Sequence, residues 1–505
     1  MEVFIERAVG KIRKLLSRRD KDKELRESCD EVLSHLKAGT PNLSEETYFA
    51  PLFCAILTKH SSKTTCLALD CIEKLLAFGY MRGTAQITSA LQAHLQRTLD
   101  LHEDTMNMTA KHGILLIDAV VEVICSCQDH SDNDVQLQVL KAVLTAATST
   151  TCAVHEHSLL KSIRASFHIY LVSKSVINQT VAKGSLQRMI ASTFQRMETA
   201  AAEPSTASTT TSTTTSTPPS TQASTSMYPS VQHLFQLKFV SRPLQTHGVL
   251  PDTSTSFPSI WHKDAYLVFR ALCRISMRFV VDDAIGDIAS DDLPQGDDPY
   301  ALQSKMISLD LLLAIINQAG NTFHSNDRFL VAIRSYLCVS LLQNCTSIYT
   351  QVVELSLRVF VVLITHFKAH LKGEMEIFIT NIFLRILDSD NSTFEHKMLV
   401  LEVLNHICDD QLILSEIFLN FDCDWDSMDL FKRIVNALAK IAKSKQRDLQ
   451  YHSSAPVARQ LKMQQNEAAL VLKGLECLTS TVHSLKKAAN FVSITDQGKP
   501  TPSGY

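Results

Sequence analysis

The fold class of this chain is decided by the stretch Met306-Ile307-Ser308-Leu309-Asp310-Leu311-Leu312-Leu313-Ala314-Ile315-Ile316. Its apolar side chains occupy every side of a helix, and we predict that helix over 304–318. A helix that is apolar all round has to be covered by other helices. The stretch therefore predicts a layered stack of helices.

Apolar patterns of helix length recur on both sides of this stretch. One of them spans 135–147 and carries a stripe formed by Leu137, Leu140 and Leu144. Only 14 Gly and 14 Pro occur in 505 residues, which is too few for the many tight turns of all-β or α/β folds. We predict an all-α fold, namely an armadillo- or HEAT-like α-solenoid in two helical segments.

A Ser/Thr/Pro-rich segment interrupts the helical patterns near the middle of the chain. Residues 204–226 contain no charged and no large apolar residue, so the segment cannot offset the entropy lost on ordering. We predict a disordered linker over 201–259. This linker would join helical regions at 1–200 and 260–490, and a short tail would follow at 491–505.

The composition offers little that points to catalysis or to nucleic acid. The chain has 49 Lys+Arg and 52 Asp+Glu and a net charge of −3, which does not favour capture of nucleic acid. No Gly-rich phosphate loop and no Gly-x-Ser-x-Gly motif occurs. The acidic run 282–298 lacks the pattern of an EF-hand, and we interpret it as a solvated loop. We expect no cofactor, no metal ion and no enzymatic activity from this chain.

The first predicted helix, over 3–19, is amphipathic and has a basic polar face. That face carries Arg7, Lys11, Arg13, Lys14 and Arg18. It fits either an anionic membrane surface or a solvated helix that ends the stack. The second interpretation is favoured, because one short helix of this charge binds lipid weakly.

The triplet His155-Glu156-His157 holds titratable groups at the beginning of another predicted helix, over 159–173. Contiguous side chains fan out around a helix and do not converge on one ligand. We interpret the triplet as a solvated helix start.

One polar cluster stands out, and it comprises Asn420, Phe421, Asp422, Cys423 and Asp424, followed by Trp425 and Asp426. It lies between an apolar pattern that ends at Leu419 and a helix predicted over 428–443. Asp424 or Asp426 can cap that helix, but capping explains only one of the three carboxylates. Two interpretations remain open, a structural junction between helices and a surface that contacts a partner.

Several stretches resemble the large Arf guanine-nucleotide exchange factors of the brefeldin A-inhibited type. Residues 69–79, 135–142 and 169–180 are similar to the family's N-terminal dimerisation and cyclophilin-binding region. Residues 263–270 resemble the opening of its second region, and residues 473–478 resemble the stretch that closes it.

The polar cluster at 420–424 resembles the family's "homology upstream" box, with Phe421 where Tyr is common. The resemblance implies that residues 1–200 form a homodimer and that the box contacts that region, within or between subunits. The box residues Asn420, Phe421, Asp422, Cys423 and Asp424 are therefore the candidate interaction site.

The resemblance further implies a role in vesicle-mediated protein transport. It implies a cytoplasmic protein that lies peripherally on Golgi and trans-Golgi network membranes and has Arf-, Arl- or Rab-type small GTPases as partners. The family's exchange domain has no counterpart in these residues, so we expect a regulatory region that does not catalyse exchange itself and that contacts the exchange domain where one is present. The alternative is an exchange-factor-like endosome–Golgi scaffold that naturally lacks that domain.

Overall fold

The computed structural model describes residues 2–16, 22–38, 45–58, 61–81, 85–88, 91–92, 95, 115–152, 154–202, 257–278, 300–389, 392–443 and 457–496. The regular structure in these ranges is helical, and the one β-type pairing in them is an isolated bridge between Gln86 and Leu115. The prediction of an all-α helical stack is confirmed. The acidic run 282–298 and most of the predicted linker lie outside the described residues.

The chain divides into two compact units. The first comprises Met1–Ala202 and Ser256–Ala271, and the second comprises Glu203–Thr255 and Leu272–Tyr505. The division falls inside helix α12 (Ile260–Ser276), so the first turns of that helix belong to the first unit.

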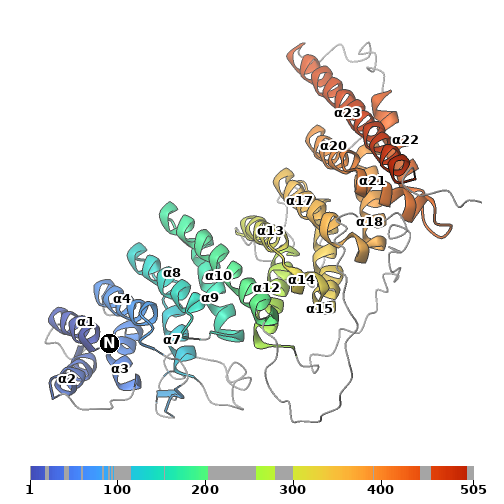
Figure 1. Cartoon of the computed structure of the whole chain (residues 1–505). Helices are drawn as coiled ribbons and strands as arrows, with labels where there is room; N and C mark the ends of the chain where they lie inside the picture. The colour runs from blue at the N-terminus through green and yellow to red at the C-terminus, as the bar shows by residue number, and fades with distance from the viewer. Residues whose placement is uncertain are drawn as a thin grey trace, which may run out of the picture. The chain divides into compact units, whose positions relative to one another are not determined.

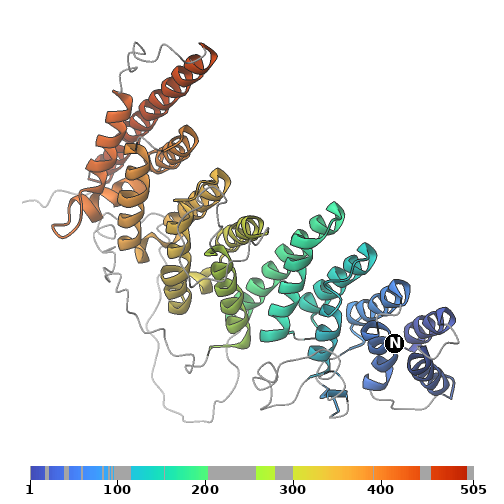
Figure 2. The ribbon, with the colours of Figure 1, turned by 180° about the vertical axis from the view of Figure 1, so that it is seen from behind.

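The first unit is built from two layers of helices, which can be followed in Figure 1 and from behind in Figure 2. Helices α4, α8 and α10 pack one against the next, and α3, α7 and α9 do the same in the other layer. Helices α1 and α2 pack together at the N-terminal end, where α1 also contacts α4. The bounds are α1 (Glu2–Leu15), α2 (Lys23–Ala38), α3 (Glu45–Leu57), α4 (Ser62–Ala77), α7 (Leu116–Cys125), α8 (Asn133–Thr148), α9 (Glu156–Val172) and α10 (Val176–Ala202).

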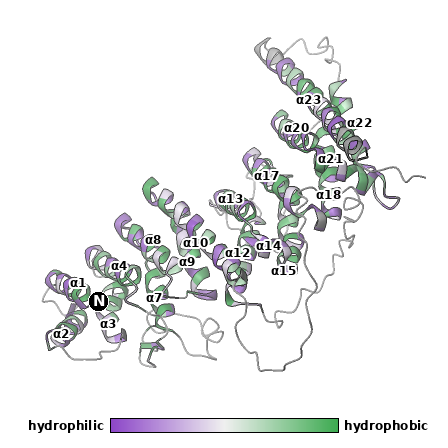
Figure 3. Ribbon diagram, in the orientation of Figure 1, coloured by the Kyte–Doolittle hydropathy of each residue, from purple (hydrophilic) through white to green (hydrophobic). Residues whose placement is uncertain are grey.

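Helix α8 shows why these residues form helices. The Asp132 side chain accepts a hydrogen bond of 2.9 Å from the backbone N–H of Asp134 and so caps the helix start. Val139 and Leu140 are fully buried against the neighbouring helices. Most helices likewise carry apolar residues on one side and polar residues on the other, as Figure 3 shows.

The second unit is also a helical stack, in which α13, α17, α20 and α23 each contact the next. Its α-helices are α13 (Ala301–Asn317), α14 (Asn321–Ser325), α15 (Asp327–Ala332), α16 (Val339–Asn344), α17 (Thr350–Phe367), α18 (Lys372–Ile377), α19 (Arg385–Asp388), α20 (Phe394–Asp409), α21 (Gln411–Ile417), α22 (Leu430–Ala442) and α23 (Val457–Asp496). Helix α13 contains the stretch that is apolar all round, and Leu309, Leu311 and Leu312 in it are fully buried.

The described residues of the second unit include three π-helical segments, of which two lie between α-helices and the third ends α21, and a 3₁₀ turn that joins α17 to α18. The π-helical segments are η2 (Ile333–Cys338), η4 (Phe378–Leu384) and η5 (Phe418–Asp422), and the 3₁₀ turn is η3 (Lys368–His370). In η5 the N–H of Cys423 donates to the carbonyl of Phe418 at 3.1 Å, five residues earlier. Because a π-helical turn contains more residues than an α-helical turn, the side chains that follow it lie on a different side of the helix than in a continuous α-helix.

Helix α17 is the one described helix that is long and apolar enough to span a membrane by length and composition. It packs between α13 and α20, and Val352, Leu357 and Leu363 on it are buried. Its apolar character is therefore used in the core of the second unit.

Candidate interaction site

The upstream box, residues 420–424, lies at the end of η5 and in the turn that leads to α22. The aromatic ring of Phe421 is fully buried, and the Lys372 ammonium lies 5.4 Å from the centroid of this ring. The Asn420 side-chain amide donates to the carbonyl of Glu416 at 2.8 Å. Phe421 thus anchors the junction in the core of the second unit.

Asp422 is the residue that caps α22. Its carboxylate accepts hydrogen bonds from the backbone N–H groups of Phe431 at 2.8 Å and Lys432 at 3.0 Å, the second and third residues of the helix. The prediction that Asp424 or Asp426 caps this helix is wrong. The reason is that the turn between η5 and α22 folds back, which places the more distant carboxylate over the free N–H groups.

Asp424 instead forms an ion pair with a lysine from another helix. Its carboxylate lies 2.5 Å from the Lys372 ammonium of α18, and the Ser427 hydroxyl donates to it at 3.0 Å. The hydrogen bond from Lys372, together with those from the backbone of Asp426 and from Ser427, lowers the pKa of Asp424 to about 2. Asp424 therefore joins the turn to α18.

Several exposed side chains around the box are apolar, although Asp426, Asp429 and Lys432 beside them are exposed as well. Cys423 is exposed, and beside it are four exposed apolar side chains that we call the box patch: Phe418, Leu419, Trp425 and Met428. Trp425 has no side-chain burial at all, and the others are 37–46% exposed. Exposed aromatic and Met side chains are enriched at interaction surfaces. The carboxylates of the box thus hold a junction that presents the box patch to solvent.

A second polar cluster joins α12 to the start of α9 inside the first unit. Both carboxylate oxygens of Asp264 are used, because Nδ1 of His155 lies 2.6 Å from one and the backbone N–H of Glu156 donates to the other at 2.7 Å. The Lys263 ammonium lies 2.6 Å from the Glu156 carboxylate. We call His155, Glu156, Lys263 and Asp264 the Asp264 latch.

The Asp264 latch corrects the interpretation of His155-Glu156-His157 as a solvated helix start. The triplet does begin α9, but Asp264 is 1% exposed and binds two of its members. Glu156 adopts a positive φ of 45°, which is uncommon outside Gly. The helix start is therefore fixed by tertiary contacts.

Trp261 adds an aromatic contact to the same junction. Its ring lies 4.5 Å from the His155 ring and 5.3 Å from the Arg196 guanidinium. Arg196 also donates to the carbonyls of Ala147 and Ser149 at the end of α8. Burial lowers the pKa of this guanidinium. The first turns of α12 are thus an integral part of the first unit.

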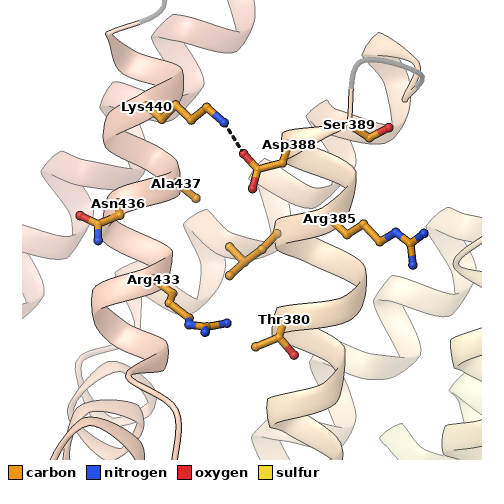
Figure 4. A pocket seen from close by; sticks show the side chains of 9 residues that line it. Thr380, Arg385, Asp388, Ser389, Arg433, Asn436, Ala437 and Lys440 are labelled. Carbon is orange, nitrogen blue, oxygen red and sulfur yellow. Dashed lines mark hydrogen bonds and ion pairs between the residues drawn. The ribbon is translucent and has the colours of Figure 1, made fainter.

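A cleft of about 650 Å³ lies between α22 and the segment formed by η4 and α19, as Figure 4 shows. Lys440 and Asp388 form an ion pair of 2.7 Å across it. The remaining lining residues are Thr380, Leu384, Arg385, Ser389, Arg433, Asn436 and Ala437. In the described part of the chain, no three His, Cys, Asp or Glu side chains come together to hold a metal ion.

The described polar clusters cap helices and join them to one another, and the exposed feature beside them is an apolar patch. The structure is that of an all-helical stack of the α-solenoid class.

Comparison with known proteins gives the family. The dimerisation and cyclophilin-binding domain of Mon2/Sec7/BIG1-like proteins matches residues 4–201, and the HUS domain of these proteins matches residues 261–430. The chain belongs to the Mon2/Sec7/BIG1-like family and contains both of these domains. The upstream box lies inside the HUS match, as do residues 261–271 of the first compact unit.

Several curated proteins are similar over most of this chain. Brefeldin A-inhibited guanine nucleotide-exchange protein 1 of Rattus norvegicus is 27% identical and aligns with 94% of this chain and 31% of its own length. Protein 3 of the same name from Arabidopsis thaliana is 30% identical, with 83% of this chain and 25% of its own length aligned. ADP-ribosylation factor guanine nucleotide-exchange factor sec71 of Schizosaccharomyces pombe is 26% identical over 84% of this chain and 23% of its own. The chain spans about a third or less of the length of these relatives.

Proposed function

We propose that this chain is a regulatory and self-association region of an Arf guanine-nucleotide exchange factor that acts in vesicle-mediated transport at Golgi membranes. The relatives are named for guanine-nucleotide exchange, and the two matched domains are a dimerisation and cyclophilin-binding domain and a HUS domain. Small GTPases of the Arf, Arl or Rab type are the partners that this role requires, and the protein would be cytoplasmic and bound peripherally to the membrane.

The observation that carries the proposal is the box patch beside a junction that hydrogen bonds and an ion pair hold together. The carboxylate of Asp422 accepts hydrogen bonds and that of Asp424 forms an ion pair within the second unit. We therefore do not assign the contact with a partner to these two groups. Trp425 is fully exposed beside them. Aromatic side chains on a preorganised surface are favoured as binding anchors. We propose that the box binds the first helical region, within one chain or between copies, and that the box patch makes the contact.

The proposal assigns no catalytic step to these residues. In the cleft beside α22, Asp388 is paired with Lys440, and in the first unit His155 is paired with Asp264, so we assign these charged groups to contacts between helices. Nucleotide exchange would then belong to an exchange domain that this region regulates.

The self-association is tested by the light-scattering mass of the full chain over a concentration series. We expect the mass of a dimer for the wild-type chain, and a lower dimer fraction in the Trp425→Ser variant would place the box contact between copies, whereas an unchanged fraction would place it within one chain. The matched control is Ile348→Ser, which removes another exposed apolar side chain of the second unit. A monomeric wild-type chain at every concentration would contradict the proposed self-association.

The catalytic assignment is tested by release of labelled GDP from Arf. We expect the rate with the full chain to equal the rate without it. A rate that increases with the concentration of this chain would show that exchange activity resides here.

A further inference from the structure

The outward face of α1 carries a row of cations. Ile5, Val9 and Ile12 are fully buried and face the core of the first unit, where α1 packs on α2 and α4. Arg7, Lys11 and Lys14 follow each other at spacings of four and three residues on the opposite side. The apolar face of α1 is thus used within the fold, and its basic face points to solvent.

These three cations have no carboxylate partner among the described residues, whereas Arg13 of the same helix forms an ion pair of 2.7 Å with Asp30. All three side chains are exposed. The face therefore has a net positive charge that the described part of the first unit does not neutralise.

An exposed aromatic cluster borders the row of cations. The ring centroids of Phe4 and Phe78 are 5.3 Å apart, and Tyr80 lies 6.1 Å from each. Phe78 is 60% exposed and Tyr80 is 40% exposed. Phe4 precedes Arg7 by three residues and therefore lies on the same side of α1. Two further apolar side chains of α1, Val3 and Leu15, are more than half exposed.

The turn that presents the aromatic rings is well defined. Gly79 has a φ of 65°, and a Cβ at this position would lie 3.0 Å from Cγ2 of Thr151. The N–H of Tyr80 donates to the carbonyl of Leu75, and the N–H of Gly79 donates to that of Leu76, which is the Schellman arrangement at a helix end. Phe78 and Tyr80 are therefore held at fixed positions.

We infer that this basic aromatic face, formed by Phe4, Arg7, Lys11, Lys14, Phe78 and Tyr80, docks on an anionic lipid bilayer. Aromatic rings favour the membrane–water interface, and juxtamembrane Lys and Arg are attracted to anionic headgroups. A second copy of the chain fits this face poorly. A two-fold interface formed by this face would bring two positively charged surfaces together, and like charges across an interface are costly. The inference rests on the proposed peripheral membrane location and names the surface that provides it.

The test is flotation of the full chain with vesicles, either of phosphatidylcholine alone or with about one third phosphatidylserine. We expect binding to the anionic vesicles and little to the neutral ones. The triple variant Arg7→Gln, Lys11→Gln, Lys14→Gln should bind the anionic vesicles more than about tenfold more weakly. The control Lys141→Gln, Lys174→Gln, Arg188→Gln removes the same charge from exposed positions elsewhere in the first unit and should change binding less than about twofold.

The aromatic contribution is tested separately. Phe78→Ala with Tyr80→Ala should weaken binding severalfold even where salt has reduced the charge attraction. The control is Val176→Ala with Ile177→Ala, which truncates two other side chains that are 74% and 69% exposed. Circular dichroism melts establish that every variant is folded.

Two results would overturn the inference. One is equal vesicle binding by the wild-type chain and both folded variants of the face. The other is a triple variant that binds vesicles normally but loses the dimer mass in light scattering, because the face would then be a contact between copies. A wild-type chain that is monomeric yet binds anionic vesicles through this face would contradict the proposed self-association and leave the lipid surface established.

Discussion

Asp264 in the first unit and Asp422 in the second both bind the N-terminus of a helix, but from different distances along the chain. Asp264 accepts from the N–H of Glu156, which is 108 residues away, and is 1% exposed. Asp422 accepts from Phe431 and Lys432, which are 9 and 10 residues away. The first is a tertiary contact between distant segments, and the second is a local cap. The difference predicts unequal effects when each carboxylate is removed.

The largest effect is expected from Asp264→Ala. It removes a buried carboxylate, leaves His155 and the N–H of Glu156 without this partner, and should lower the free energy of unfolding of the first unit by about 3 kcal/mol. Urea denaturation of the full chain measures it. Asp264→Asn keeps an acceptor for Glu156 and should lose less. A loss below about 0.5 kcal/mol for Asp264→Ala would contradict the role of the latch.

A smaller effect is expected from Asp422→Ala. A lost cap should lower the free energy of unfolding of the second unit by about 1 kcal/mol. The control is Asp426→Ala, a neighbouring exposed carboxylate that does not cap α22, and it should change stability by less than about 0.5 kcal/mol. If both variants lost the same free energy of unfolding, the stabilisation would come from negative charge near α22 and not from the cap.

The pH dependence of the junction follows from Asp424. Its pKa is lowered from 3.8 to about 2, so its ion pair with Lys372 stabilises the fold above pH 3.8 and the stabilisation is lost as the pH falls toward 2. The fluorescence of Trp425, the next residue, should report this loss. In Lys372→Met the transition should move up toward pH 3.8. An unchanged transition in that variant would contradict the ion pair.

The smallest effect on stability is expected from Trp425→Ser. The side chain is fully exposed, so its removal should change the free energy of unfolding by less than about 0.5 kcal/mol. Thermal melts of Trp425→Ser and Phe421→Ala measure the difference. Phe421→Ala should be much less stable, because loss of a buried aromatic ring lowers the free energy of unfolding by about 3–5 kcal/mol. A large loss with Trp425→Ser would mean that the box patch is packed in solution.

The helices that could be predicted are those with dense apolar patterns. The helix predicted over 304–318 is α13, displaced by a few residues, because packing on several sides demands apolar residues on every face. The sequence patterns do not predict helices α2 and α3. Only Leu25, Cys29 and Val32 of α2 are buried, and α3 contains Pro51, so neither has a clear signature.

The position of the box was visible in the sequence, but its chemistry was only partly so. Carboxylates before a helix indicate a cap, yet the choice of Asp422 depends on how the turn folds. The sequence predicts that Phe418 and Leu419 complete an apolar helix, but both are exposed, and the regular α-helix ends at Ile417, where η5 begins. The Asp264 latch left no local signal, because its partners are more than 100 residues apart in the chain.

Hydrogen–deuterium exchange of the full-length wild-type chain and its Trp425→Ser variant tests the central claim most directly, namely that the box patch makes the contact and the box carboxylates hold the junction. We expect faster exchange in peptides of the first helical region, with an unchanged melting temperature. Exchange that changes only around the junction itself would contradict a contact between the box and the first region.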